Sequence, residues 1–172
     1  MFPKLSRQVW RRLYPGLVVV GLAALGTGGL AIAAYSNQMD IPTYIASLST
    51  PQVTVADLQQ GKLKPVVLVD VRSPEEHDED RIGNSELVPL SDLEMGFGVI
   101  QIKAIAKAAQ KGGADPTLVL YCTAGARSVK AYKLLQATGL KFVVLKGGIQ
   151  EWRRQLPASQ DAAILSPITL AP

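Results

Sequence analysis

The sequence predicts an α/β fold: a three-layer domain with a mostly parallel central sheet flanked by helices, preceded by one transmembrane helix. Three short, continuous apolar runs, at 66–69, 118–121 and 142–145, are typical of strands buried on both faces of a parallel sheet. Helical patterns lie between them, at 99–111 and 128–138, and glycine follows each, as suits a helix C-cap. This alternation of strand and helix predicts the layered fold.

The boundaries of the domain follow from composition. Residues 52–157 are enough for one modest core, and residues 54–58 have the pattern of a short capped helix near its start. Residues 158–172 are rich in Pro, Ala and Ser and carry little pattern, which predicts a poorly ordered tail.

The N-terminal part of the chain has the composition of a membrane anchor. Residues 1–15 form a basic segment without acidic side chains, and residues 16–35 carry no charge. At about 1.5 Å per residue, such a helix crosses a bilayer core of roughly 30 Å, so residues 16–35 predict a single-pass span. The alternative is a cleaved signal peptide, with cleavage at Ala31-Ile32-Ala33-Ala34 and export of a soluble domain. The apolar stretch exceeds the usual signal core of about 7 to 15 residues, which favours the anchor.

The distribution of charge sets an orientation and argues against one class of partner. The N-terminal segment accounts for the whole excess charge, because residues 36–172 balance their basic and acidic side chains. The positive-inside rule then places the N-terminus in the cytoplasm and the domain on the far side, in a periplasm or a thylakoid lumen. A neutral domain gives no reason to expect a nucleic-acid partner. Residues 36–51 are predicted to be a stalk, with helical apolar spacing over 41–48 that suits a short helix lying on the domain or on the membrane.

The lone cysteine, Cys122, directly follows the apolar run 118–121 and cannot form a disulfide within the chain. A short loop rich in Gly and Ala separates it from a helical pattern. Such a loop points backbone N–H groups and the positive end of a helix dipole at the sulfur. That geometry favours a thiolate, which predicts a reactive cysteine. The alternative is a small buried side chain without chemistry.

Four pieces of the sequence together resemble the rhodanese (sulfurtransferase) family over about residues 52–157. In order they are Asp70-Val71-Arg72-Ser73-Pro74-Glu75-Glu76, Val88-Pro89-Leu90, Cys122-Thr123-Ala124-Gly125-Ala126-Arg127-Ser128 and Gly147-Gly148-Ile149-Gln150-Glu151-Trp152. Two departures lie in the first half of the domain. Asp80-Arg81-Ile82-Gly83-Asn84-Ser85 replaces the family's usual Gly-His-Ile-x-Gly-Ala, and His77 stands where an aromatic residue is usual.

This resemblance implies a sulfurtransferase that carries sulfur as a persulfide on the catalytic residue Cys122. It implies that the loop binds substrate through Thr123, Ala124, Gly125, Ala126, Arg127 and Ser128. The donor would be a small sulfane-sulfur compound such as thiosulfate, with Arg127 suited to its oxyanion. The acceptor would be cyanide or a thiol, including a thiol on a thioredoxin-like protein. We expect no cofactor. We also expect no metal, because the only histidine, His77, has no second His or Cys nearby.

Two other function classes remain open from the sequence. One is a membrane-tethered binding module that uses the fold as a scaffold, although such modules commonly lack the cysteine that this chain retains. The other is a cysteine phosphatase, whose loops carry five residues between Cys and Arg, whereas four lie between Cys122 and Arg127. We further expect His77 to be exposed, and Asp70, Arg72 and Glu76 to form a buried structural ion pair. Trp152 and the glycines before it are expected to pack against the sheet.

Overall fold

The computed structural model describes residues 28–63, 65–110 and 115–161. Its centre is a five-stranded, all-parallel sheet with the order β1-β5-β4-β2-β3. The strands are β1 (Gln52–Val53), β2 (Val66–Asp70), β3 (Glu86–Leu87), β4 (Thr117–Tyr121) and β5 (Phe142–Leu145). The central strand β4 pairs with β2 along its whole length, so the carboxyl ends of both strands reach the same edge of the sheet. A crevice at that edge is where ligands usually bind in such folds.

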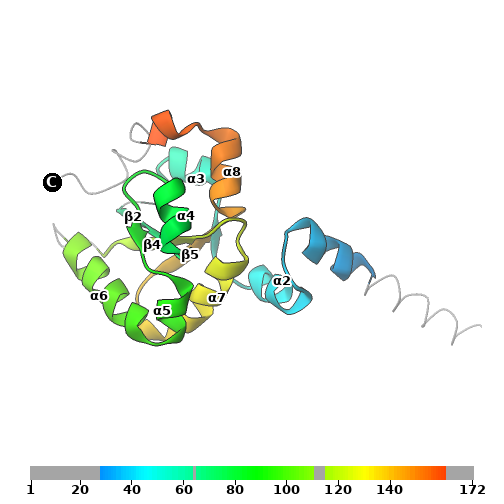
Figure 1. Cartoon of the computed structure of the whole chain (residues 1–172), viewed down its shortest axis with the longest axis horizontal. Coiled ribbons are helices and arrows are strands. Elements are labelled where there is room, and N and C mark those ends of the chain that lie inside the picture. The colour runs from blue at the N-terminus through cyan, green and yellow to red at the C-terminus, as the bar shows by residue number, and fades with distance from the viewer. Residues whose placement is uncertain (1–27, 64, 111–114, 162–172) are drawn as a thin grey trace, which may run out of the picture.

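Helices cover both faces of the sheet and make the predicted three layers (Figure 1). They are α2 (Ile41–Leu48), α3 (Val55–Gln59), α4 (Pro74–Glu79), α5 (Leu90–Glu94), α6 (Phe97–Ala109), α7 (Ala126–Leu135) and α8 (Gly148–Gln155), with the 3₁₀ turns η1 (Gln136–Thr138) and η2 (Ala158–Gln160). Helices α3 and α8 pack on one face, whereas α5, α6 and α7 pack on the other.

Strand alternation divides the core between the two faces. In β4, Val119 and Tyr121 point into the cluster with Trp152 of α8, while Leu118 and Leu120 point into the cluster with α6 and α7. Successive side chains of a strand face opposite sides, so a strand covered on both sides must be apolar throughout. That requirement explains the continuous apolar runs in the sequence.

The observed elements confirm the predicted strands and helices within a few residues and add several others. The predicted cap at the start of α3 is a capping box in which Thr54 and Asp57 bond each other's backbone N–H groups. The two-residue strands β1 and β3 and the short helices α4, α5 and α8 are additions to the elements predicted from the sequence. The predicted poorly ordered tail is wrong for residues 158–161, which form η2 and bury Asp161; residues 162–172 lie outside the described residues.

Two helical segments precede the sheet within the described residues (Figure 1). Residues 28–36 are helical, and α2 follows with Asp40 as its N-cap, whose carboxylate accepts from the backbone N–H and the hydroxyl of Thr43. α2 confirms the helical spacing over 41–48 and packs on α7 and β5 through Ala46, Val129 and Val144. Within the described residues no helix has the length and hydropathy to cross a bilayer. Most of the predicted span 16–35 lies outside those residues.

Candidate active site

The candidate site is the loop that joins β4 to α7. Cys122 is the first residue after β4, and α7 begins four residues later at Ala126. Gly125 lies between them with φ +122°, a backbone conformation that favours glycine, and its N–H donates to Cys122 Sγ at 3.1 Å. Ser128 Oγ lies 3.7 Å from the same sulfur and donates to the carbonyl of Gly125. The thiol is buried and sits at the N-terminus of α7, where the helix dipole stabilises a negative charge.

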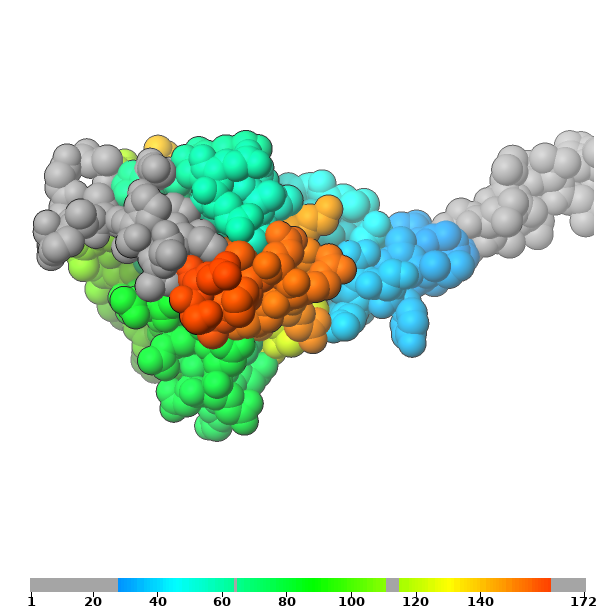
Figure 2. Space-filling model, turned by 90° about the horizontal axis from the view of Figure 1, so that it is seen from above, coloured from blue at the N-terminus to red at the C-terminus, as the bar shows by residue number. Residues whose placement is uncertain are grey.

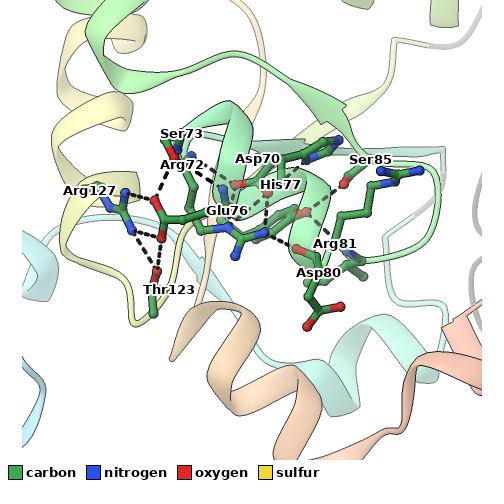
Figure 3. Close-up of polar contacts among 12 residues, drawn as sticks. Asp70, Arg72, Ser73, Glu76, His77, Asp80, Arg81, Ser85, Thr123 and Arg127 are labelled. Carbon is green, nitrogen blue, oxygen red and sulfur yellow. Dashed lines mark hydrogen bonds and ion pairs between the residues drawn. The ribbon is translucent and has the colours of Figure 1, made fainter.

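Glu76, which lies far from the loop in the sequence, holds it through Arg127 and Thr123. The guanidinium of Arg127 donates to both carboxylate oxygens of Glu76, at 2.6 and 2.7 Å, and also to Thr123 Oγ1 at 2.7 Å. Thr123 Oγ1 in turn donates to Glu76 at 3.0 Å (Figure 3). Arg127 lowers the pKa of Glu76 to about 2, because the ion pair stabilises the carboxylate. Glu76 therefore ties α4 to the candidate loop and neutralises the positive charge of Arg127.

The start of α8 supports the loop from the opposite side. The N–H groups of Ile149 and Gln150 donate to the carbonyls of Cys122 and Thr123, at 2.8 and 3.1 Å. Gly148, with φ +58°, lies so close that a Cβ on it would meet Cys122 O at 2.2 Å. The glycines of the closing motif therefore contact the catalytic loop rather than only the sheet, whereas Trp152 is buried in the core as predicted.

A buried polar group lies beneath this loop. The carboxylate of Asp70, at the end of β2, accepts from Arg72 at 2.7 and 3.0 Å, and His77 Nδ1 lies 3.1 Å from it. The guanidinium of Arg72 stacks over the ring of Tyr121, 5.7 Å from its centroid. Burial raises the pKa of Tyr121. The predicted buried ion pair of Asp70, Arg72 and Glu76 is confirmed for Asp70 and Arg72 but is wrong for Glu76, which is partly exposed and pairs with Arg127. The prediction of an exposed His77 is wrong, because Asp70 gives the imidazole a buried partner.

A third polar group fixes the end of the domain. Asp161 accepts from Trp152 Nε1 at 2.8 Å, from the backbone N–H of Gly83 at 3.0 Å and from Arg153. Arg153 also binds Asp80 in a bidentate ion pair. These contacts connect α8 to the segment 80–85, where the sequence departs from the usual family pattern.

Comparison with known proteins agrees with this geometry. The profile of the rhodanese-like domain family matches residues 50–155. The chain belongs to this family. Over 111 residues it is 36% identical to the probable adenylyltransferase/sulfurtransferase MoeZ of Mycobacterium tuberculosis, a match that covers 64% of this chain and 25% of that protein. The chain thus spans about a quarter of the length of that relative.

Other relatives are closer in size. A 16.5 kDa protein of Synechococcus elongatus is 32% identical over 100 residues, which cover 56% of this chain and 62% of that one. A solved structure from Rhodopseudomonas palustris, described as a possible tyrosine phosphatase, is 29% identical with a TM-score of 0.50 and covers 66% of this chain and 86% of that one. A yeast protein tyrosine phosphatase of the rhodanese family shares the fold with a TM-score of 0.53 at 17% identity, covering 65% of this chain and 90% of that one.

The rhodanese-like loop borders a cavity of about 250 Å³. Ala124, Gly125 and Gly147 line it, as do Tyr44 and Leu48 of α2. The remaining lining residues are Asn37, Met39, Ser47, Gln52, Val129, Val144, Leu145 and Lys146. Met39, which precedes α2, lies against Gly125: a Cβ there would be 2.9 Å from the methyl group of Met39. α2 and the residues just before it thus form part of the surroundings of the candidate loop.

The structure brings the predicted site residues together around Cys122, and it adds others. Ala124 and Ala126 are the half-buried small residues of the loop, and Ser128 is buried on the first turn of α7. Direct substrate contact by the loop residues stays a prediction. Sequence reasoning missed Glu76 as the partner of Arg127 and Gly148 as a support of the loop. Among the residues that the structure describes, no cluster of His, Cys, Asp or Glu could hold a metal ion.

Proposed function

We propose that this chain is a sulfurtransferase that moves a sulfane sulfur through a persulfide on Cys122. The observation that carries the proposal is the Gly125 N–H bonded to Cys122 Sγ at the N-terminus of α7. A preorganised backbone donor and a helix dipole stabilise a thiolate and, after sulfur transfer, a persulfide anion. The relationship to MoeZ, whose name includes a sulfurtransferase activity, supports the same chemistry.

The reaction divides into two displacements on sulfur. The Cys122 thiolate attacks the outer sulfur of the donor, the S–S bond of the donor breaks, and the leaving group departs with the electron pair, as sulfite does when thiosulfate is the donor. An acceptor thiolate or cyanide then attacks the outer sulfur of the persulfide. The S–S bond breaks again and Cys122 leaves as a thiolate, so no net oxidant is needed.

The electrostatics of the loop bear on the choice of donor. Arg127 is paired with Glu76 in a bidentate geometry, so the two side chains together contribute little net charge. Backbone N–H groups are therefore the main donors available to a bound anion. This arrangement suits persulfide donors with a compact reacting end as well as thiosulfate.

The loop also bears on the phosphatase alternative, which two structural neighbours raise. Four residues lie between Cys122 and Arg127, one fewer than in the phosphatase loops, and Arg127 is bound to Glu76. A smaller ring suits one sulfur atom better than a phosphate group. We therefore expect no hydrolysis of a phosphate monoester.

Intact-mass spectrometry of the full chain in mild detergent tests this proposal. After thiosulfate treatment, the protein should gain the mass of one sulfur atom and lose it on addition of cyanide or excess thiol. The Cys122→Ser variant should gain none. A folded protein that acquires no labile sulfur from thiosulfate or from an organic persulfide would favour a scaffold role. Turnover of para-nitrophenyl phosphate by the same preparation, absent in Cys122→Ser, would favour a phosphatase.

We further propose that residues 16–35 retain the protein in a membrane, with the domain on the side away from the cytoplasm. The basic residues before the uncharged stretch support this orientation. Protease added to spheroplasts should digest the domain, and carbonate washing should leave the intact chain in the membrane pellet. Protection of the domain would reverse the orientation, and a soluble product beginning near Ala34 would indicate a signal peptide.

A further inference from the structure

Helix α2 exposes its large apolar side chains, whereas a helix that packs only on a domain would bury them. Its buried face consists of small or hydroxyl-bearing residues, Thr43, Ala46 and Ser47. Its large apolar residues are exposed: Ile41 is 43% exposed, Ile45 51%, and Leu48, which also borders the cavity beside the loop, 67%. Spacings of four and three residues place all three on one helix face. A surface helix normally turns this stripe toward the core.

The helix before α2 also carries exposed large apolar side chains. Ile32 and Tyr35, on the helical residues 28–36, are 70% and 86% exposed. Both helices project together from one end of the domain, opposite α6 (Figures 1 and 2). Several large apolar side chains exposed on neighbouring elements suit an interaction site better than single scattered ones.

The sequence around this surface indicates which partner covers it. Between Arg12 and Asp57 the chain holds one charged residue, Asp40, and its carboxylate is used as the N-cap of α2. The uncharged stretch that begins at residue 16 runs directly into these helices, and four basic side chains precede it. A basic segment, an apolar stretch and an amphipathic helix in this order suit a lipid bilayer better than a water-soluble partner.

We infer that the outer face of α2, formed by Ile41, Ile45 and Leu48, lies in the interface of a lipid bilayer. This inference rests on the proposed membrane anchor and is independent of the proposed sulfur chemistry. Because Met39 packs on Gly125 and α2 lines the cavity beside the loop, the membrane surface then lies next to the catalytic loop. A donor or acceptor would reach Cys122 along that surface.

Site-specific fluorescence on the full chain tests this contact. Cys122→Ser provides a background without thiols, into which Ile45→Cys or Ile100→Cys is introduced and labelled with an environment-sensitive dye. Ile100 is a matched control, because it is an isoleucine 70% exposed on α6, at the opposite end of the domain. The labelled chains are reconstituted in vesicles of phosphatidylcholine and phosphatidylglycerol.

The label at position 45 should emit at shorter wavelength than the label at position 100. It should lose most of its fluorescence to nitroxide-bearing lipids and little to aqueous iodide, with the opposite pattern at position 100. Iodide quenching at 45 equal to that at 100, in chains that stay with the vesicles, would overturn the inference and leave the anchor intact. Shielding from both quenchers would show that protein covers the face, either a second copy or another segment of the chain, and would also overturn it. Chains that do not stay with the vesicles would overturn the anchor and the inference together.

Discussion

Removing the ion pair between Glu76 and Arg127 should destabilise the catalytic loop by a measurable amount. The pKa of Glu76 is lowered from its ordinary 4.5 to about 2, mainly by the hydrogen bonds from Arg127. At about 1.4 kcal/mol for each tenfold change in proton affinity, this difference corresponds to roughly 3 kcal/mol. About a third of each side chain is exposed, at 34% and 36%, so solvent screens the interaction. We therefore expect a coupling free energy of about 1.5 kcal/mol.

A double-mutant cycle measures this coupling. The full chain in mild detergent is unfolded with urea as wild type, Glu76→Gln, Arg127→Gln and the double variant. Trp152, which is buried in the core, reports unfolding in a Trp10→Phe background. The double variant should lose less stability than the sum of the losses of the two single variants, because each single variant leaves one charge unpaired at the loop.

The exposed pair Asp57–Lys62 provides a control for this cycle. The pKa of Asp57 is also lowered to about 2, mainly by Lys62, but Lys62 is 58% exposed and the pair touches no part of the catalytic loop. Its coupling should be smaller. A coupling at Glu76–Arg127 below about 0.5 kcal/mol, or no larger than at the control pair, would refute the view that Glu76 holds Arg127.

Three further outcomes follow from the structure. Gly148→Ala should lower the free energy of unfolding in urea by about 3 kcal/mol and abolish most persulfide formation, because its Cβ would meet Cys122 O in a left-handed backbone conformation. Wild-type stability would contradict this contact. The pKa of Glu76 in the folded protein lies below its ordinary value, so the difference in unfolding free energy between wild type and Glu76→Gln should be largest above pH 4.5 and disappear as the pH falls to about 2. A difference independent of pH would show that the Glu76 carboxylate is not its source. Asp161→Ala should lower the free energy of unfolding in urea by about 2 kcal/mol, because it leaves Trp152 Nε1 buried without its acceptor. Sulfur transfer by the protein that remains folded should be unchanged.

Sequence patterns predict the parts of this fold that depend on neighbours in the chain. Runs such as 118–121 must be apolar because both faces of β4 are covered, and Thr54 can be recognised as a cap from Asp57 three residues later. Contacts between distant segments produce no such pattern in the sequence. Glu76 and Arg127 lie 51 residues apart, and the acidic residues around Glu76 resemble a solvated surface.

The same reasoning explains the wrong expectations. His77 lies in an acidic run and therefore resembles an exposed residue, but its helix α4 turns it toward Asp70 of β2. Asp161 follows an apparently patternless segment, yet it is the acceptor for Trp152. Both depend on a partner that only the tertiary fold supplies. The apolar spacing in α2 predicts a helix correctly, but it cannot tell which way the helix turns its stripe.

The support that α8 gives to the catalytic loop has a consequence for how the protein is made. A ribosome synthesises Cys122 well before Ile149 and Gln150, whose N–H groups bond the carbonyls of Cys122 and Thr123. In a nascent chain that stops short of these residues, the carbonyl groups of Cys122 and Thr123 lack the two hydrogen bonds that hold them. The thiol thus acquires its mature surroundings only after the start of α8 has been synthesised, and fragments that end before α8 would lack these contacts to the loop.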